Sequence, residues 1–235
     1  MSAPRLFVAS TALANGRAYL DQDERRYLIT VLRLGVGDAV TILDGDGMLY
    51  PGTIALIGKK DVVCDLGEGQ PAGGEPEREV HLWIACLKGE RMDWLVQKAT
   101  ELGVAAIHLM ATERTVVRDP NAKLDRWRKI AREAAEQSER GRVPPILESR
   151  PLADRSLPLG AFFCAERRRD APGLPAALRD IADETVHVLI GPEGGWTDEE
   201  VRLLEDRGAT PVSLGPLILR AETAAIAALA LLLLP

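Results

Sequence analysis

The segment VLIGPEGGWTDEEV, from Val188 to Val201, constrains this chain more than any other, because it passes from strand-like to helix-like residues across one short turn. Val186 to Ile190 is short, apolar and rich in β-branched residues, as a buried strand is. The glycines of GPEGG allow the backbone to bend sharply and to approach a ligand closely. Thr197 to Glu200 has the spacing of a capping box, in which the two side chains satisfy free backbone N–H groups at the start of a helix. The segment therefore predicts a strand, a glycine turn and a helix.

A second turn of the same kind occurs near the C-terminus, in SLGPLILRAETA from Ser213 to Ala224. It follows another strand-like run and carries Arg220, Glu222 and Thr223 directly before an apolar helix. Neither turn has the Gly-Lys-Ser/Thr of a phosphate-binding loop, and neither is GxGxxG. One glycine turn alone is typical of an ordinary strand-to-helix connection, but ligands of open α/β sheets bind beyond the carboxyl ends of the strands. Two such turns after successive strands therefore favour a ligand pocket with two walls.

These two segments resemble the cofactor-binding motifs of the SPOUT methyltransferases, and within them those of the RsmE family, which methylates N3 of a uracil in 16S ribosomal RNA. The N-terminal PRLFV and the segment Val31–Tyr50 resemble the small PUA-like β-barrel that precedes the methyltransferase domain in this family. One departure is that Arg26 and Tyr27 stand where many relatives have a His. Three further segments resemble family signatures: KGERMDWLVQKATELGV (Lys88–Val104), TERTVV (Thr112–Val117) and RWRKIAREAAEQSERGRVPPI (Arg126–Ile146).

The chain divides naturally at GEGQPAGGEPERE, Gly67 to Glu79, where Gly, Pro and charged residues accumulate without periodicity. Before it, short apolar runs separated by turn signals indicate a small all-β unit, with one short helix from Asp21 to Leu32. After it, strand and helix patterns alternate, which predicts a mostly parallel sheet covered on both faces. The expected strands are Val80–Leu87, Val104–Met110, Ala161–Ala165 and Val186–Ile190, and the expected helices are Glu90–Leu102 and Leu124–Arg140.

Pattern and resemblance together give an α/β fold class, with a SPOUT-type α/β knot methyltransferase domain after a small PUA-like β-barrel domain. We expect residues 1–70 to form the RNA-binding barrel, 71–79 the linker and 80–235 the methyltransferase domain. The resemblance alone implies a C-terminal trefoil knot, a homodimer and S-adenosylmethionine as cofactor. The apolar run from Ala224 to Leu234 is too short to span a bilayer, so we expect it to be buried in the monomer or at a dimer interface, with no membrane partner.

Charge and cysteine content exclude some functions. The net charge of −6 argues against a nonspecific nucleic-acid coat protein, because such binding depends on phosphate neutralisation by Lys and Arg. Basic residues still gather around Arg126 to Arg142, as an RNA-facing surface or as a solvated helix face. The three cysteines show no CxxC pairing, which indicates a reducing cytoplasm and gives no sign of a zinc site. The three histidines lie in apolar strand-like runs, where structural roles are expected, so no metal is predicted.

The chemistry of the family reaction selects the candidate site residues. Methylation of uracil N3 requires loss of its proton and stabilisation of the developing negative charge. Arg220 and Arg114 are the expected catalytic cations, and Glu222 is expected to remove the proton or to orient Arg220, unless it only stabilises a helix N-terminus. RNA contacts are expected from Arg5, Arg33, Arg132 and Arg140, with surface solubility as the alternative. Cofactor contacts, mostly through main-chain atoms, are expected from Leu189, Gly191, Glu193, Gly194, Gly195, Leu214, Gly215, Leu219 and Arg220, although the leucines could simply pack in the core.

The function that the resemblance implies is S-adenosylmethionine-dependent methylation of N3 of a specific uridine in the 16S RNA of the small ribosomal subunit. Two alternatives remain open. In one, the chain is a noncatalytic RNA-binding dimer, which predicts no cofactor binding. In the other, it is an S-adenosylmethionine-dependent methyltransferase acting on another RNA or on a small molecule, for which the N-terminal barrel is not needed if the substrate is small.

Overall fold

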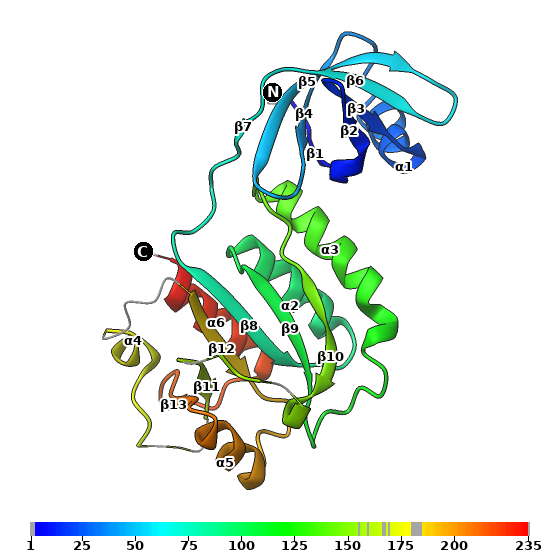
Figure 1. Ribbon diagram of the computed structural model, residues 1–235. Helices are drawn as coiled ribbons and strands as arrows, with labels where there is room; N and C mark the ends of the chain where they lie inside the picture. The colour runs from blue at the N-terminus through cyan, green and yellow to red at the C-terminus, as the bar shows by residue number, and fades with distance from the viewer. Residues whose placement is uncertain are drawn as a thin grey trace. The chain divides into compact units, whose positions relative to one another are not determined.

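The computed structural model describes residues 3–154, 156–158, 160–165, 168, 170–179 and 185–234 (Figure 1). Contacts between Cα atoms divide the chain into two compact units. The first comprises residues 1–75 together with 135–143, and the second comprises residues 76–134 and 144–235. The segment 135–143 therefore belongs with the N-terminal part of the chain, although it is distant in sequence. The predicted boundaries at residues 70 and 79 stay predictions.

The first unit is a curled, largely antiparallel sheet with the strand order β1-β4-β5-β6-β3-β2, and β7 pairs with β5. Among the strands described in this unit, only β1 and β4 pair in parallel. A 3-10 turn, η1 (Ser10–Ala12), precedes β2. The strands are β1 (Arg5–Phe7), β2 (Leu13–Ala14), β3 (Arg17–Leu20), β4 (Ala39–Leu43), β5 (Met48–Ile57), β6 (Val62–Leu66) and β7 (Gln70–Pro71).

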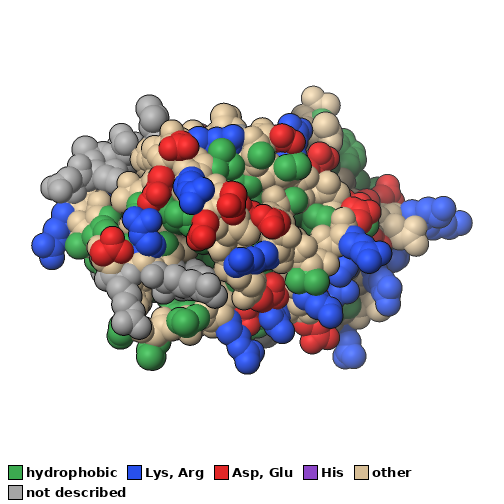
Figure 2. All heavy atoms as spheres, turned by 90° about the horizontal axis from the view of Figure 1, so that it is seen from below, with side chains coloured by type: hydrophobic (Ala, Val, Ile, Leu, Met, Phe, Trp, Pro, Cys, Tyr) green, Lys and Arg blue, Asp and Glu red, His purple; other side chains and the backbone are tan. Residues whose placement is uncertain are grey.

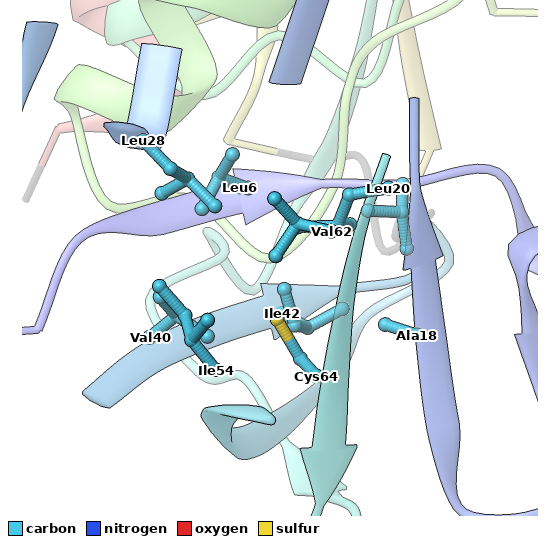
Figure 3. Close-up of a cluster of buried hydrophobic side chains, with 10 residues drawn as sticks. Leu6, Ala18, Leu20, Leu28, Val40, Ile42, Ile54, Val62 and Cys64 are labelled. Atoms are coloured by element: carbon cyan, nitrogen blue, oxygen red, sulfur yellow. The ribbon is translucent and has the colours of Figure 1, made fainter. Parts of the chain in front are cut away.

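The core of this unit follows from the two-residue alternation of its strands. Ala18 and Leu20 of β3 are buried, whereas Arg17 and Tyr19 between them are exposed. Figure 3 shows the side chains that meet inside: Leu6, Ala18, Leu20, Leu28, Val40, Ile42, Ile54, Val62 and Cys64.

The predicted helix from Asp21 to Leu32 is present, but it has two parts. Asp21 and Glu24 form a capping box that starts α1 (Gln22–Arg25). The chain then continues as a wider π-helical turn, η2 (Arg26–Val31), which directs Leu28 into the core. The sequence pattern gave no sign of this change of helix type.

The described residues of the second unit form a sheet of six strands, all parallel, in the order β10-β9-β8-β12-β11-β13 (Figure 1). This confirms the predicted parallel sheet. Its strands are β8 (Glu79–Ala85), β9 (Ala106–Ala111), β10 (Ile146–Pro151), β11 (Phe162–Cys164), β12 (Thr185–Ile190) and β13 (Thr210–Val212). Its helices are α2 (Glu90–Glu101), α3 (Leu124–Gln137, whose last three residues belong to the first unit), α4 (Leu174–Ala177), α5 (Asp198–Asp206) and α6 (Ala221–Leu233), with 3-10 turns η3 (Asn121–Lys123) and η4 (Leu152–Asp154).

Helices pack on the sheet because their apolar residues would otherwise face water. The nearly uncharged α6 contacts β8, β12 and α2, which accounts for the apolar C-terminal sequence. Leu204 of α5 instead joins Trp83 of β8 and Leu189 of β12 in a separate buried cluster. Among the described residues, no helix combines the length and apolarity that crossing a bilayer requires.

The predicted elements agree with the structure to within a few residues. The strand β10 was not predicted, because its sequence contains Pro151 and most of its side chains are exposed. As an edge strand, β10 tolerates both features, since one side of its backbone needs no ladder partner. The trefoil knot stays a prediction.

Candidate functional site

The first glycine turn leaves β12 and enters α5 through the predicted capping box. Thr197 Oγ1 accepts a hydrogen bond from the backbone N–H of Glu200 at 3.2 Å, and Glu200 Oε2 accepts one from the N–H of Thr197 at 2.9 Å. The other oxygen of Glu200, Oε1, accepts a hydrogen bond from the backbone N–H of Glu113 at 2.9 Å. Glu200 therefore joins the loop after β9 to the start of α5, a role that the sequence reading missed.

Packing explains two glycines of this turn. A Cβ atom on Gly191 would lie 3.0 Å from the ring of Trp196. A Cβ atom on Gly194 would lie 3.1 Å from the side chain of Arg114. Gly195 has a φ of +70°, a left-handed conformation that favours glycine. The turn is thus close-packed against its own protein neighbours.

Arg114 holds this turn from the loop after β9. Its Nη1 donates hydrogen bonds to the carbonyl oxygens of Gly194 at 2.8 Å and Trp196 at 3.2 Å. It does not line the pocket described next. The geometry therefore favours a positioning role for Arg114 over the catalytic role expected from the sequence.

A cavity of about 410 Å³ lies between the two glycine turns. Its size falls in the range of roughly 300–1,000 Å³ that is typical of small-molecule sites. The lining is mostly apolar or glycine, and three of the described lining residues are charged: Arg91, Glu193 and Arg220. The residues that line it are Arg91, Cys164, Ala165, Ile190, Gly191, Pro192, Glu193, Val212, Ser213, Leu214, Gly215, Leu217, Ile218, Leu219, Arg220, Ala221 and Ala224.

The structure brings six predicted cofactor residues into this lining: Gly191, Glu193, Leu214, Gly215, Leu219 and Arg220. Leu189 is completely buried and packs in the cluster with Trp83 and Leu204, so its position is that of a core residue. Gly194 and Gly195 shape the turn without lining the cavity.

Glu222 lies in the first turn of α6, two residues after Arg220, and also stands outside the lining. Its Oε2 atom is buried and meets no hydrogen-bond donor among the described residues. The exposed Arg220 is the N-cap residue of α6. Both predicted groups therefore lie at the start of the same helix, Arg220 in the cavity wall and Glu222 outside it.

Arg91 is a charged lining residue that the sequence analysis did not predict. It lies in the first turn of α2, and its Nη1 is 3.1 Å from Glu193 Oε1. The two residues meet because β8 and β12 are adjacent parallel strands, so that the segments after their carboxyl ends lie side by side, and the sequence carried no signal of this adjacency.

The three histidines lie together on the sheet. His81 Nδ1 is 3.0 Å from His108 Nε2, and Trp83 Nε1 donates a hydrogen bond to His187 Nδ1 at 3.1 Å. Burial lowers the pKa of His187 to about 4, with His81 adding to the effect, and burial also lowers the pKa of His81. Among the described residues, no group of three or more His, Cys, Asp or Glu side chains is arranged to hold a metal ion.

The predicted RNA-binding arginines have different environments. Arg5 Nη2 donates hydrogen bonds to the carbonyl oxygens of Glu139 and Arg140 at 3.0 and 3.3 Å. Arg140 is 4% exposed and its Nη2 is 2.6 Å from Glu75 Oε2, which favours a structural role over an RNA contact. Arg33 is exposed with a φ of +60°, and Arg132 is half-buried.

Charge is not uniform on the surface. Figure 2 shows acidic and basic side chains interspersed on the face seen from below, with more Lys and Arg toward the right of the view. Three of the cations of α3, Arg126, Arg128 and Lys129, form ion pairs with Asp93, Asp125 and Glu133. The basic residues of this helix are therefore largely balanced by neighbouring carboxylates.

Comparisons with known proteins agree with this arrangement. Residues 74–233 match the model of the RNA methyltransferase domain, and residues 20–67 match the RNA methyltransferase PUA domain. The chain is 37% identical over 233 residues to ribosomal RNA small subunit methyltransferase E of Synechocystis, covering 96% of this chain and 76% of that protein. It is 32% identical to the protein of the same name from Bacillus subtilis, covering 88% and 86%.

A solved structure shows the same fold. The ribosomal RNA small subunit methyltransferase E of Neisseria gonorrhoeae, bound to S-adenosyl methionine, has a TM-score of 0.86 to this chain at 30% identity, covering 97% of this chain and 96% of that one. The two family domains and the relatives account for most of the sequence. The chain therefore belongs to the ribosomal RNA small subunit methyltransferase E family of RNA methyltransferases.

Proposed function

We propose that this chain is an S-adenosylmethionine-dependent enzyme that methylates N3 of a specific uridine in the 16S RNA of the small ribosomal subunit. The observation that carries the proposal is the cavity between the turns after β12 and β13. Gly191 and Glu193 come from one turn, and Leu214, Gly215 and Leu219 come from the other. A related protein of the same name binds S-adenosyl methionine.

The residues of the cavity fit this cofactor. Apolar walls from Ile190, Leu214 and Leu219 suit a flat adenine ring, and the charged side chains suit the amino-acid end. A Cβ atom on Gly215 would meet no other atom within 4 Å, so the backbone is open there. We infer that main-chain groups of both turns hold the adenosine part.

When bound, S-adenosylmethionine supplies a methyl group that its sulfonium has already activated. The protein must hold the uracil in line, exclude water and deal with the N3 proton, because N3 exchanges its bond to hydrogen for a bond to carbon. Arg220 is exposed at the cavity, where its guanidinium can stabilise negative charge that develops on the uracil oxygens. Glu222, two residues further on, is our candidate for accepting the proton.

We further propose that residues 1–70 act as the RNA-binding barrel, 71–79 as the linker and 80–235 as the methyltransferase domain, whose C-terminal segment forms a trefoil knot. The family models support this division, because they match residues 20–67 and 74–233. Arg33, Arg132 and, at the edge of the first sheet, Arg5 are the proposed RNA contacts. We place the reaction in the cytoplasm, for which the three free cysteines are suited.

A homodimer is part of the proposal. Leu231 of α6 and Trp94 of α2 are 47% and 45% exposed, and the two helices pack against each other. A second copy covering these side chains would remove apolar surface from water. Sedimentation equilibrium tests this, and a monomer at micromolar concentration would contradict it.

The function is tested by incubating the protein with labelled S-adenosylmethionine and small ribosomal subunits that lack the modification, followed by nucleoside analysis of the 16S RNA. A labelled 3-methyluridine supports the proposal. Binding of the cofactor without transfer would favour another RNA or a small molecule as substrate. RNA binding without cofactor binding would favour a noncatalytic RNA-binding dimer.

A further inference from the structure

Leu217 and Ile218 are the most exposed large apolar side chains among the described residues, with exposed fractions of 77% and 76%. They are neighbours in the turn after β13, and both line the cavity. Apolar side chains are unfavourable in water, so an adjacent pair that is held exposed at the edge of a cavity indicates a surface that a ligand covers.

The apolar lining of the cavity differs in depth. Ile190 is 2% exposed, and Leu214 and Leu219 are half-buried, whereas Leu217 and Ile218 lie in solvent. The buried and half-buried residues form the inner part of the cavity, which suits the adenine of the cofactor. Leu217 and Ile218 therefore mark the open side of the cavity, from which a second molecule must approach the methyl group.

Arg220 adds a cation to this open side. It is exposed, lines the same cavity and follows Ile218 by two positions. A uracil ring has two apolar faces, and its N3 lies between two carbonyl oxygens at the ring edge. An apolar pair near one guanidinium therefore matches a uracil that packs one face on Leu217 and Ile218 and turns its oxygens toward Arg220.

We propose that Leu217 and Ile218 form the subsite for the pyrimidine ring of the target nucleotide, an inference that rests on the proposed function. Enzymes that act on a base take it out of its stack and hold it against apolar or aromatic side chains. Contact with the pair replaces part of the stacking that the uracil loses. The ring then lies beside the methyl donor, at the open side of the cavity, and the cofactor keeps the inner part.

The test uses Leu217→Gln and Ile218→Thr, which make the two side chains polar with little change in size. Methyl transfer to small ribosomal subunits that lack the modification, at saturating S-adenosylmethionine, gives kcat and the KM for the subunits. Calorimetry gives the affinity for S-adenosylhomocysteine, and sedimentation equilibrium gives the oligomeric state.

Two further variants serve as controls. Ile218→Val keeps an apolar side chain at the same position. Leu147→Gln changes a leucine that is 39% exposed on β10, at the opposite edge of the sheet from β13, and that lies outside the cavity lining. Thermal unfolding of each variant checks that it is folded.

We expect the KM for the subunits to rise by about fivefold or more in Leu217→Gln and in Ile218→Thr, because each loses apolar contact with the ring. The affinity for S-adenosylhomocysteine should stay within about twofold of the wild-type value, and so should the KM of Ile218→Val and of Leu147→Gln. The oligomeric state should be the same in all of them.

Three results would overturn the subsite. Weaker binding of S-adenosylhomocysteine in Leu217→Gln and Ile218→Thr would assign the pair to the cofactor. A changed oligomeric state would assign the pair to a second copy of the chain. An unchanged KM in both variants would mean that the base does not contact the pair.

Failure of the proposed function gives a different result. A wild-type protein that binds S-adenosylhomocysteine but transfers no methyl group to the subunits would remove the proposed substrate, and the subsite for its base with it. That result is seen in the wild type, whereas the three results above are differences between the wild type and the variants.

Discussion

Arg114 Nη1 donates a hydrogen bond of 2.8 Å to the carbonyl oxygen of Gly194, and this contact ties the loop after β9 to the first glycine turn. The side chain of Arg114 also fills the space that a Cβ atom on Gly194 would need. The conformation of the turn thus depends on a residue 80 positions earlier in the chain. The shape of the cavity therefore also depends on Arg114, because Gly191 and Glu193 of the same turn line the cavity.

Substitution of Arg114 separates a positioning role from a catalytic one. Arg114→Met removes two hydrogen bonds from an exposed guanidinium, which costs about 1 kcal/mol. We expect affinity for S-adenosylhomocysteine to fall by about fivefold, with partial recovery in Arg114→Lys. Calorimetry and methyl-transfer kinetics measure the two effects. Unchanged affinity together with a large loss of kcat would restore the catalytic role that the sequence suggested.

A methyl group at Gly191 should disturb the cavity through Trp196. The added Cβ would lie 3.0 Å from the ring of Trp196, whose Nε1 donates a hydrogen bond to the carbonyl oxygen of Cys164. Overpacking of this kind costs about 1–3 kcal/mol, so Gly191→Ala should lower both Tm and affinity for S-adenosylhomocysteine. Gly35→Ala is the control, because its nearest neighbour would be at an ordinary 3.9 Å. Equal Tm values for Gly191→Ala and the wild type would show that Trp196 moves aside freely.

Acid should destabilise the second unit through His187. Burial lowers its pKa to about 4 in the folded chain, whereas an unfolded chain has a pKa near 6.5. The unfolded state therefore binds more protons between these pH values. The contribution of His187 to the free energy of unfolding is full above pH 6.5 and is lost as the pH falls toward 4. We expect a loss of roughly 1–2 kcal/mol after allowance for partial exposure.

The measurement is urea unfolding at a series of pH values in the wild type and in His187→Gln. Gln still accepts the hydrogen bond from Trp83 but does not titrate. The variant should show a smaller loss of stability in acid. Identical pH dependence in the two proteins would mean that His187 is not responsible.

The buried ion pair between Arg140 and Glu75 should contribute more to the free energy of unfolding than an exposed ion pair does. Glu75 Oε1 also accepts hydrogen bonds from the N–H groups of Gly141 and Arg142, so Glu75→Ala leaves Arg140 buried without its carboxylate. We expect a loss of about 3 kcal/mol or more in unfolding free energy. The exposed Arg17–Asp65 pair is the comparison, and Asp65→Asn should cost no more than about 1 kcal/mol. Equal losses would contradict the structural role given to Arg140.

Local chemistry determined which parts of this molecule were predictable. The capping box of Thr197 and Glu200 was visible because it depends on residues three apart. The two cavity walls could also be predicted from the sequence, because each is a glycine turn that directly follows a strand. The ion pair of Arg91 with Glu193 depends on residues 102 positions apart, which no local pattern reports. The same reason explains why the contact of Arg114 with Gly194 and the burial of Arg140 were not predicted.

The central claim is that the two glycine turns are the two walls of one cofactor site. A crystal structure of the chain with S-adenosylhomocysteine tests it most directly. The account predicts adenosine density between Gly191 of the first turn and Leu214 and Leu219 of the second, with main-chain atoms of both turns in contact with it. Density for the ligand at any other place on the molecule would contradict the account.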